Sequence, residues 1–237
     1  SMIGRPNVSA EEIGTLLEKD QVLSAKVLRL ANSPFYGFPS RIASVAHAVV
    51  VLGLNVVKGL TLCATAFDMM RNAGMNELWR HSLGVAMTAH ILGTKAAMKN
   101  PEEVFVAGLL HDIGKVVLYV KWPDVGQQIT TVTRNTSRPL MDTEQELFEV
   151  THADVGGWLA SAWHLPTSLR EPILHHHTPA AAQDAKLQTA IVHVADVLVK
   201  GLACGNPGDD LVPPLSRQAW DLVGLDAQSL AHCLTQA

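Results

Sequence analysis

The chain has 237 residues, of which 48% are hydrophobic and 17% charged, and its formal net charge at pH 7 is −4. This length allows one large domain or two small ones, each with its own core, and the composition is that of a soluble globular protein. The chain has no block of basic residues. The overall electrostatic signature of a nucleic-acid-binding protein is therefore absent, and we do not expect a nucleic-acid partner.

The cysteines and the apolar runs predict the cellular location. Cys63, Cys204 and Cys233 are widely spaced and form no CxxC pair, which is typical of reduced thiols in a cytosol. The longest apolar run, residues 42–67, is interrupted by Lys58 and other polar residues, so it indicates two buried helices and not a membrane span. The chain start shows no signal-peptide pattern. We expect a cytoplasmic protein without a membrane segment.

Helical periodicity accounts for nearly all of the sequence pattern, and capping residues place many of the boundaries. The predicted helices cover residues 9–19 (capped by Ser9 with Glu12), 20–31 (capped by Asp20), 44–51 (capped by Ser44), 54–70, 76–98, 101–111, 123–133, 142–150, 151–163, 167–174, 180–200, 214–222 and 226–234. The pattern therefore predicts an all-α protein.

Two N-terminal segments allow more than one interpretation. The loop of residues 32–39 holds three aromatic side chains, which either dock a partner or, more commonly, plug a core from the side. The short helix, glycine turn and longer helix of residues 44–70 also describe a helix-turn-helix that reads DNA. That second helix carries only Lys58, with Arg71 beyond its end, as phosphate contacts. We therefore favour structural packing.

The stretch Gly108–Lys115 places a histidine directly before a carboxylate at the end of an apolar helix. If Pro101 opens that helix, His111 falls on its buried face, and Asp112 lies at the edge of the same face. A buried carboxylate is costly unless it is paired, hydrogen-bonded or bound to a metal. A histidine and a carboxylate can both bind a divalent cation, and the carboxylate can bridge two. A helix-end histidine beside a solvated aspartate is the simpler interpretation of this pair alone.

Further polar residues turn inward on other predicted helices. His81 lies on an apolar stripe, and Glu77, four residues earlier, either supports it or joins it as a ligand. His152 and Asp196 also share faces with apolar residues, and His193 lies on a face next to that of Asp196. Taken alone, each histidine is more often a core residue that is hydrogen-bonded locally.

Two polar segments have a plain structural interpretation. Residues 175–177 are three histidines at the end of a predicted helix, where cationic side chains favour the C-terminus. The predicted helix of residues 142–150 carries Glu144, Glu146 and Glu149, which we interpret as a mostly solvated face.

The inward-facing residues together favour a shared ligand over separate local roles. They come from different helices of one predicted bundle and are His81, His111, Asp112, His152, His176, His177 and Asp196. Buried polar residues need partners, and a cation shared by this set would supply one. No cysteine joins the set, so its nitrogen and carboxylate ligands suit one or two divalent ions of iron, manganese, zinc, nickel or cobalt. The set predicts a mixed His/Asp metal centre.

The motifs that contain these residues resemble a known family. Gly108–Lys115 is similar to the HDxGK form of the HD-domain superfamily of metal-dependent phosphohydrolases. In chain order, the segments that resemble an HDOD domain are LRLANS (28–33), LG (52–53), LWRHS (78–82), AGLLHDIGK (107–115), HADVG (152–156), WHLP (163–166) and HHTP (176–179). This resemblance implies a single multi-helix, HD-like bundle with an N-terminal helical subdomain.

By the same resemblance the chain divides into a lead-in of residues 1–6, an HDOD domain of residues 7–200, and a C-terminal loop with capping helices at 201–237. Within the domain, residues 7–71 would form the N-terminal subdomain and residues 72–200 the HD-like bundle. The serine before the first methionine looks like a cloning remnant.

The resemblance also implies roles for individual residues. By similarity with the HD and HD-GYP families, one metal centre matches His81, His111, Asp112 and Asp196, and a second, bridged by Asp112, matches His152 with His176 or His177. Lys115 matches a lysine that these families place near a substrate phosphate. Thr178 and Pro179 stand where cyclic di-GMP phosphodiesterases have a glutamate and a downstream GYP signature, which argues against that substrate.

Two functions follow from the resemblance. HDOD domains are regarded as regulatory modules of bacterial signalling, so we expect a signal-transduction module that keeps its metal site and acts through a protein partner. The alternative is a metal-dependent phosphohydrolase that acts on a nucleotide or another phosphoester. In that alternative Asp112 bridges metals that activate water, and Lys115 neutralises charge that develops on the phosphoryl group.

Overall fold

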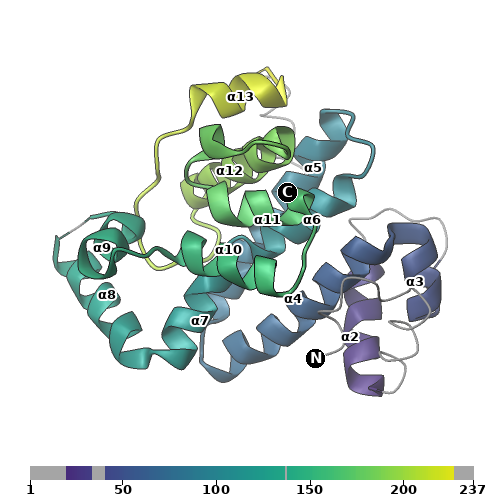
Figure 1. Cartoon of the computed structure of the whole chain (residues 1–237), viewed down its shortest axis with the longest axis horizontal. Helices are drawn as coiled ribbons and strands as arrows, with labels where there is room; N and C mark the ends of the chain where they lie inside the picture. Colours follow the sequence, from purple (N-terminus) through teal and green to yellow (C-terminus); the bar gives the residue numbers. More distant parts are fainter. Residues whose placement is uncertain (1–19, 34–40, 137, 227–237) are drawn as a thin grey trace.

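Helices supply the regular structure throughout residues 20–33, 41–136 and 138–226, which are the residues that the computed structural model describes (Figure 1). The prediction of an all-α protein is confirmed. The helices are α2 (Gln21–Ala31), α3 (Val45–Leu52), α4 (Leu54–Asn72), α5 (Asn76–Lys95), α6 (Pro101–Leu110), α7 (Ile113–Lys121), α8 (Pro123–Thr136), α9 (Leu140–Phe148), α10 (His152–Ala162), α11 (Thr167–His175), the short 3-10 helix η3 (Pro179–Ala181), α12 (Lys186–Gly201) and α13 (Arg217–Val223).

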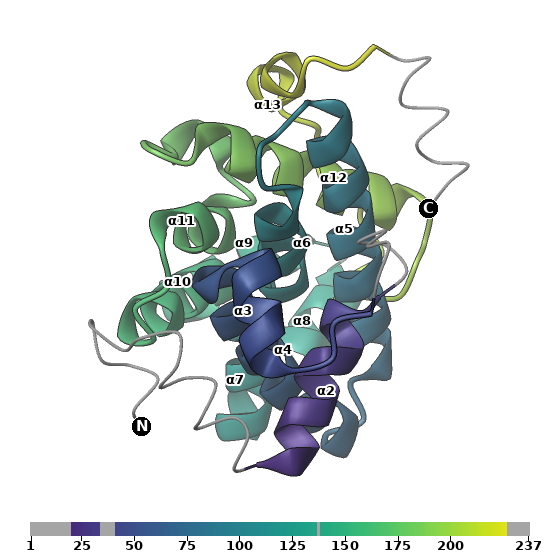
Figure 2. The same ribbon diagram turned by 90° about the vertical axis from the view of Figure 1, so that its right-hand side faces the viewer.

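The helices α2 and α3 pack together against α4 (Figure 2). Both begin after their predicted caps. Asp20 accepts a 3.0 Å hydrogen bond from the backbone amide of Leu23, and Ser44 accepts a 3.1 Å hydrogen bond from that of His47. Lys58, which a DNA-reading helix would present to phosphate, is buried in α4. This arrangement agrees with the packing interpretation of the segment.

The helices α5, α6 and α12 form the centre of the fold (Figures 1 and 2). Around them, α4 and α11 pack on α6, and α10 packs on α7 and α11. The stripe predicted on α5 is buried over its whole length, from Leu78 through His81 to Leu92. The centre of the fold therefore buries a histidine on a largely apolar helix stripe, away from solvent.

Some predictions concern residues that the structure does not describe. These are the helix at 9–19, the aromatic residues of the 32–39 loop and most of the helix at 226–234. Within the described ranges, no helix is both long and apolar enough to cross a membrane.

The start of α12 differs from the prediction. The sequence predicts a helix over residues 180–200, but α12 begins at Lys186, after η3 and a short bent segment. The carboxylate of Glu171, on α11, accepts hydrogen bonds from the backbone amides of Gln183, Asp184 and Ala185, at distances from 2.7 to 3.3 Å. A side chain from a neighbouring helix thus binds amides that would otherwise belong to an earlier helical turn.

Replacing Glu171 with alanine should lower the free energy of unfolding by about 2 kcal/mol, because backbone amides would lose their acceptor. Glu146→Ala, at an exposed position, should change it by less than about 1 kcal/mol. Urea unfolding followed by circular dichroism measures both values. Equal, small effects in the two variants would contradict this role of Glu171.

Candidate metal centre

The His111–Asp112 pair lies in the break between α6 and α7. The backbone of this break packs closely against the start of α10. A Cβ atom added at Gly114 would lie only 1.9 Å from the backbone oxygen of His152. Only glycine allows this approach. The glycine of the HDxGK stretch therefore brings α10, which carries His152, up to Asp112.

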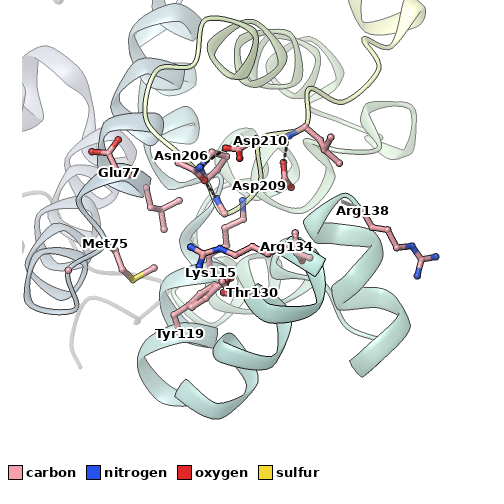
Figure 3. A pocket seen from close by; sticks show the side chains of 16 residues that line it. Met75, Glu77, Lys115, Tyr119, Thr130, Arg134, Arg138, Asn206, Asp209 and Asp210 are labelled. Carbon is pink, nitrogen blue, oxygen red and sulfur yellow. Dashed lines mark hydrogen bonds between the residues drawn. The ribbon is translucent and has the colours of Figure 1, made fainter. Parts of the chain in front are cut away.

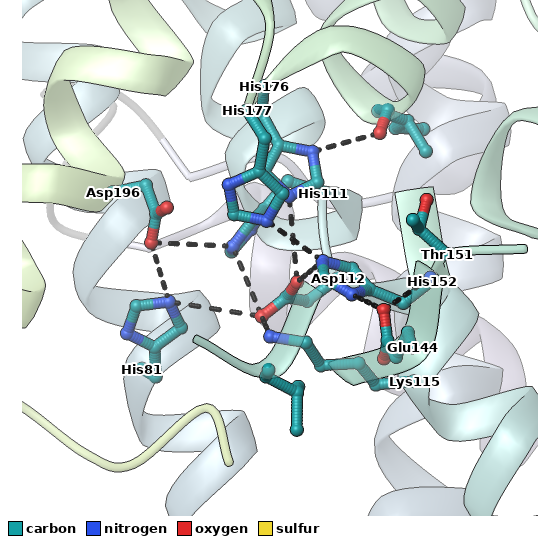
Figure 4. A network of polar contacts seen from close by, with 12 residues as sticks. His81, His111, Asp112, Lys115, Glu144, Thr151, His152, His176, His177 and Asp196 are labelled. Atoms are coloured by element: carbon teal, nitrogen blue, oxygen red, sulfur yellow. Dashed lines mark hydrogen bonds and ion pairs between the residues drawn. The ribbon is translucent and has the colours of Figure 1, made fainter. Parts of the chain in front are cut away.

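Asp112 lies between two groups of ligand-type side chains (Figure 4). Its Oδ2 atom is 3.3 Å from Nε2 of His111 and 3.9 Å from Nε2 of His81. The Oδ1 atom of Asp196 is 3.0 Å from Nε2 of His81 and 3.9 Å from that of His111. These four residues, the first set, come from α5, the α6–α7 break and α12.

The other oxygen of Asp112 faces the second set, which consists of Asp112, His152, His176 and His177. Asp112 Oδ1 is 3.3 Å from Nε2 of His152 and 3.7 Å from Nε2 of His176. The Nε2 atoms of His152 and His177 are 3.0 Å apart. Within the triads His81–His111–Asp196 and His152–His176–His177, the ligand atoms lie within 4.8 Å of one another. The structure thus brings together every residue of the predicted set.

The histidine rings are oriented by hydrogen bonds on the side away from the centre. Nδ1 of His111 donates to the Gly108 carbonyl at 2.7 Å, and Nδ1 of His176 donates to the Ile173 carbonyl at 2.9 Å. These bonds place the ring proton on Nδ1. The Nε2 lone pair of each ring therefore points to the centre, as it does in a histidine that binds a metal.

Two of these inward atoms have no hydrogen-bond partner among the described residues. They are Nε2 of His176 and Oδ1 of Asp112, both buried. Leaving such atoms unpaired in a helical core costs free energy. A divalent cation would satisfy them, so the donor set fits a metal.

Burial and neighbouring charges favour the protonation states that metal binding needs in His176, His177 and Asp112, but not in His111. Burial holds the pKa of His176 well below its usual range, and burial together with the charge of His152 lowers the pKa of His177 to about 3. Burial alone would raise the pKa of Asp112, but His111 and Lys115 hold it well below its usual range. Burial would lower the pKa of His111, yet the adjacent Asp112 raises it overall.

The comparisons with known proteins identify the family. Residues 1–179 match the family model of the HDOD domain. The chain belongs to the HDOD family. The resemblance predicted from the motifs is thereby confirmed.

Solved structures with this fold cover nearly the whole chain. An HDOD domain protein of unknown function from Geobacter sulfurreducens is 29% identical, with a TM-score of 0.73, and the match covers 98% of this chain and 84% of that one. A candidate phosphohydrolase from Shewanella amazonensis SB2B is 25% identical, with a TM-score of 0.68, and the match covers 99% and 85% of the two chains. The MmoQ response regulator of Methylococcus capsulatus is 25% identical, with a TM-score of 0.52, and the match covers 98% and 92%.

A longer relative also exists. The HDOD chain is 25% identical over 215 residues to an uncharacterized protein of Treponema pallidum (strain Nichols). The match spans 88% of this chain and 42% of that protein. Together, the family and the neighbours support an HD-like regulatory or phosphohydrolase protein.

Lys115 is buried next to the carboxylate of Asp112. Its Nζ atom donates a 2.8 Å hydrogen bond to Oδ2 of Asp112. Burial would lower the pKa of Lys115, but Asp112 raises it, so the amine stays protonated. The HDOD protein therefore keeps a positive charge beside Asp112.

The prediction that the acidic face of residues 142–150 is mostly solvated is wrong for Glu144. Glu146 and Glu149 are exposed, but Glu144 is fully buried, and its Oε2 atom lies 2.6 Å from Nδ1 of His152. It also accepts a 2.8 Å bond from the His152 backbone amide. Glu144 thus orients His152, and its position four residues after the buried Leu140 is the sequence signal that could have revealed it.

Two other residues near the predicted set have different roles. Glu77 is exposed and pairs with Arg80 at 3.2 Å, so it does not join the first set. His193 is buried, with Nδ1 donating to the His176 carbonyl at 2.7 Å and Nε2 accepting from the Ser216 amide at 3.0 Å. His193 therefore fastens the histidine loop to the C-terminal segment.

Replacing Glu144 with glutamine should weaken metal binding by about tenfold or more, because His152 would lose the carboxylate that orients it. The matched change Glu146→Gln, two residues away and exposed, should have little effect. Competition of a fluorescent chelator with each purified variant measures the affinity. Equal affinities in the two variants would exclude the orienting role.

Acid should destabilise the metal-free protein. The unfolded chain takes up protons on its histidines near pH 6.5, whereas burial keeps His176 and His177 neutral, the latter down to a pKa of about 3. The unfolded state then binds more protons, so the free energy of unfolding falls as the pH drops below about 6.5. His177 alone should account for about 3 kcal/mol at about pH 4.5, and His111, with its raised pKa, acts in the opposite direction.

Calorimetric unfolding in a chelator, between about pH 7.5 and 4.5, tests this expectation. The melting temperature should decrease steadily below about pH 6.5. A melting temperature that stays constant or rises would show that the buried histidines do not control acid stability.

Proposed function

We propose that this HDOD protein is a metal-dependent phosphohydrolase whose two metal-binding sets share Asp112. The observation that carries the proposal is the division of the Asp112 oxygens, with Oδ2 facing His111 and Oδ1 facing His152, each at 3.3 Å. A carboxylate in this position can bridge two metal ions. The similarity to a candidate phosphohydrolase supports the same chemistry.

Each part of the centre has a role in this proposal. The first set, His81, His111, Asp112 and Asp196, would hold one divalent ion, and the second set, Asp112, His152, His176 and His177, would hold the other. When bound, such ions supply a water of lowered pKa and a Lewis acid for a phosphoryl oxygen. The nitrogen and carboxylate donors suit iron, manganese, zinc, nickel or cobalt.

The protein's own residues orient the ligands and stabilise charge. Glu144 holds the ring of His152, and backbone carbonyls hold those of His111 and His176. Lys115 places its ammonium group beside Asp112, where it would neutralise negative charge that develops on a phosphoryl group. The substrate in this proposal is a nucleotide or another phosphoester.

The second candidate function is that of a bacterial signal-transduction module in the cytoplasm that acts through a protein partner. The likeness to the MmoQ response regulator, which extends over 98% of this chain, favours it. In this alternative the metal centre stabilises the fold or senses a signal, and no phosphoester is cleaved.

Turnover of phosphomonoesters, nucleotides and cyclic dinucleotides by metal-loaded protein separates the two functions. We expect metal-dependent hydrolysis that Asp112→Asn abolishes. Lys115→Gln should lower kcat by about 100-fold, with the metal content unchanged, because one charge that stabilises the transition state is lost. Circular dichroism serves as the control for folding.

Metal-loaded wild-type protein without turnover of any of these substrates would exclude the phosphohydrolase. The signalling module would then be the function to test, by its interaction with a partner protein.

A further inference from the structure

A cavity of about 590 Å³ lies beside the metal-binding sets (Figure 3). Its walls come from α7, α8, the start of α5 with the turn before it, and the loop after α12. Lys115, which lines the cavity, also bonds Asp112, and Leu78 in its wall lies one helical turn before His81. The cavity thus extends to within one side chain of the bridging carboxylate.

Most charged side chains around the cavity are already paired. Asp209 binds Lys200 at 2.7 Å, and Arg138 pairs with Glu146. Arg134 is different, since no hydrogen bond or ion pair joins its side chain to another residue in the described part of the chain. Figure 3 shows Arg134 reaching into the cavity, whereas Arg138 points away from it. The cavity therefore holds an unpaired guanidinium group.

We infer that this cavity binds a small phosphorylated molecule of about nucleotide size, and that Arg134 holds its anionic group. A guanidinium group matches the geometry of phosphate with two parallel hydrogen bonds. The volume lies within the range of small-molecule sites. The inference rests on the proposed function in one respect: hydrolysis at the metals would act on the ligand that this cavity places near Lys115. Binding of the ligand itself can be tested without turnover.

The loop after α12 forms a fixed wall of this site. Gly205 has a φ of +72°, and a Cβ atom added there would lie 2.4 Å from both the Glu77 carbonyl oxygen and the His81 amide nitrogen. Asp209 accepts a 2.9 Å hydrogen bond from the Leu140 amide in addition to its pair with Lys200. The loop is therefore fastened to three helices, α5, α9 and α12.

This wall lies beyond residue 179, where the match to the HDOD family model ends. Asn206 and Asp210 belong to it and are hydrogen-bonded to each other at 2.8 Å. They present an amide and a carboxylate opposite the two cations, Lys115 and Arg134. A part of the chain outside the family match would thus select among phosphorylated ligands.

Calorimetric titration with inorganic phosphate, AMP, GMP and adenosine tests the inference, in both metal-free and manganese-loaded protein. We expect at least one nucleotide to bind wild-type protein, and adenosine, which lacks the phosphate, to bind at least about tenfold more weakly. Arg134→Gln should weaken nucleotide binding by about tenfold or more, and Arg134→Lys should restore part of it. Arg138→Gln removes the same charge nearby and should change the affinity less than about twofold.

The inference is wrong if none of the phosphorylated probes binds wild-type protein more tightly than Arg134→Gln, or if Arg138→Gln weakens binding equally. Binding that depends on Arg134 without any hydrolysis would support the inference and contradict the proposed function. Hydrolysis whose KM is unaffected by Arg134→Gln would support the proposed function and contradict the inference.

Discussion

The fold of this protein has to accommodate the carboxylate of Asp112 in its core, where it is only 1% exposed. An isolated carboxylate in a helical core would be strongly destabilising. Here Lys115 lies on one side of it and the rings of His81, His111, His152 and His176 surround the rest. Much of the local structure, including the break between α6 and α7 and the close approach of α10 at Gly114, serves to assemble these neighbours.

The residues of the candidate metal centre come from segments that are far apart in the chain, so the site exists only when the bundle is complete. His81 belongs to α5, His152 to α10 and Asp196 to α12. Three of the rings are held by a group behind them: a backbone carbonyl for His111 and for His176, and the Glu144 carboxylate for His152. This second layer of hydrogen bonds keeps the inward nitrogens available, which is the condition for tight metal binding.

The sequence predicted what depends on local pattern. Helical periodicity and the caps Asp20 and Ser44 located the N-terminal helices, and the inward faces of the helices selected His81, His152 and Asp196. The HDxGK stretch and the HDOD motifs then grouped these residues around Asp112. Local signals sufficed here because each residue's burial follows from the helix that carries it.

The features that the sequence missed depend on contacts between separate elements. The acid-rich sequence of its helix predicts a solvated Glu144, and only its contact with His152 reveals its role. The late start of α12 results from Glu171, twelve or more residues away from the amides that it binds. The loop at Gly205 contacts the backbone of His81 across the fold. Such contacts leave no periodic signal in the chain.

The central claim is that Asp112 bridges two metal ions, and anomalous diffraction from crystals of the manganese-loaded protein tests it most directly. The account predicts two anomalous peaks, one on each side of the Asp112 carboxylate, separated by about 3.5 to 4 Å. One peak would be among the ligands of the first set, and the other among those of the second. A single peak, or none among these ligands in a well-folded crystal, would contradict the claim.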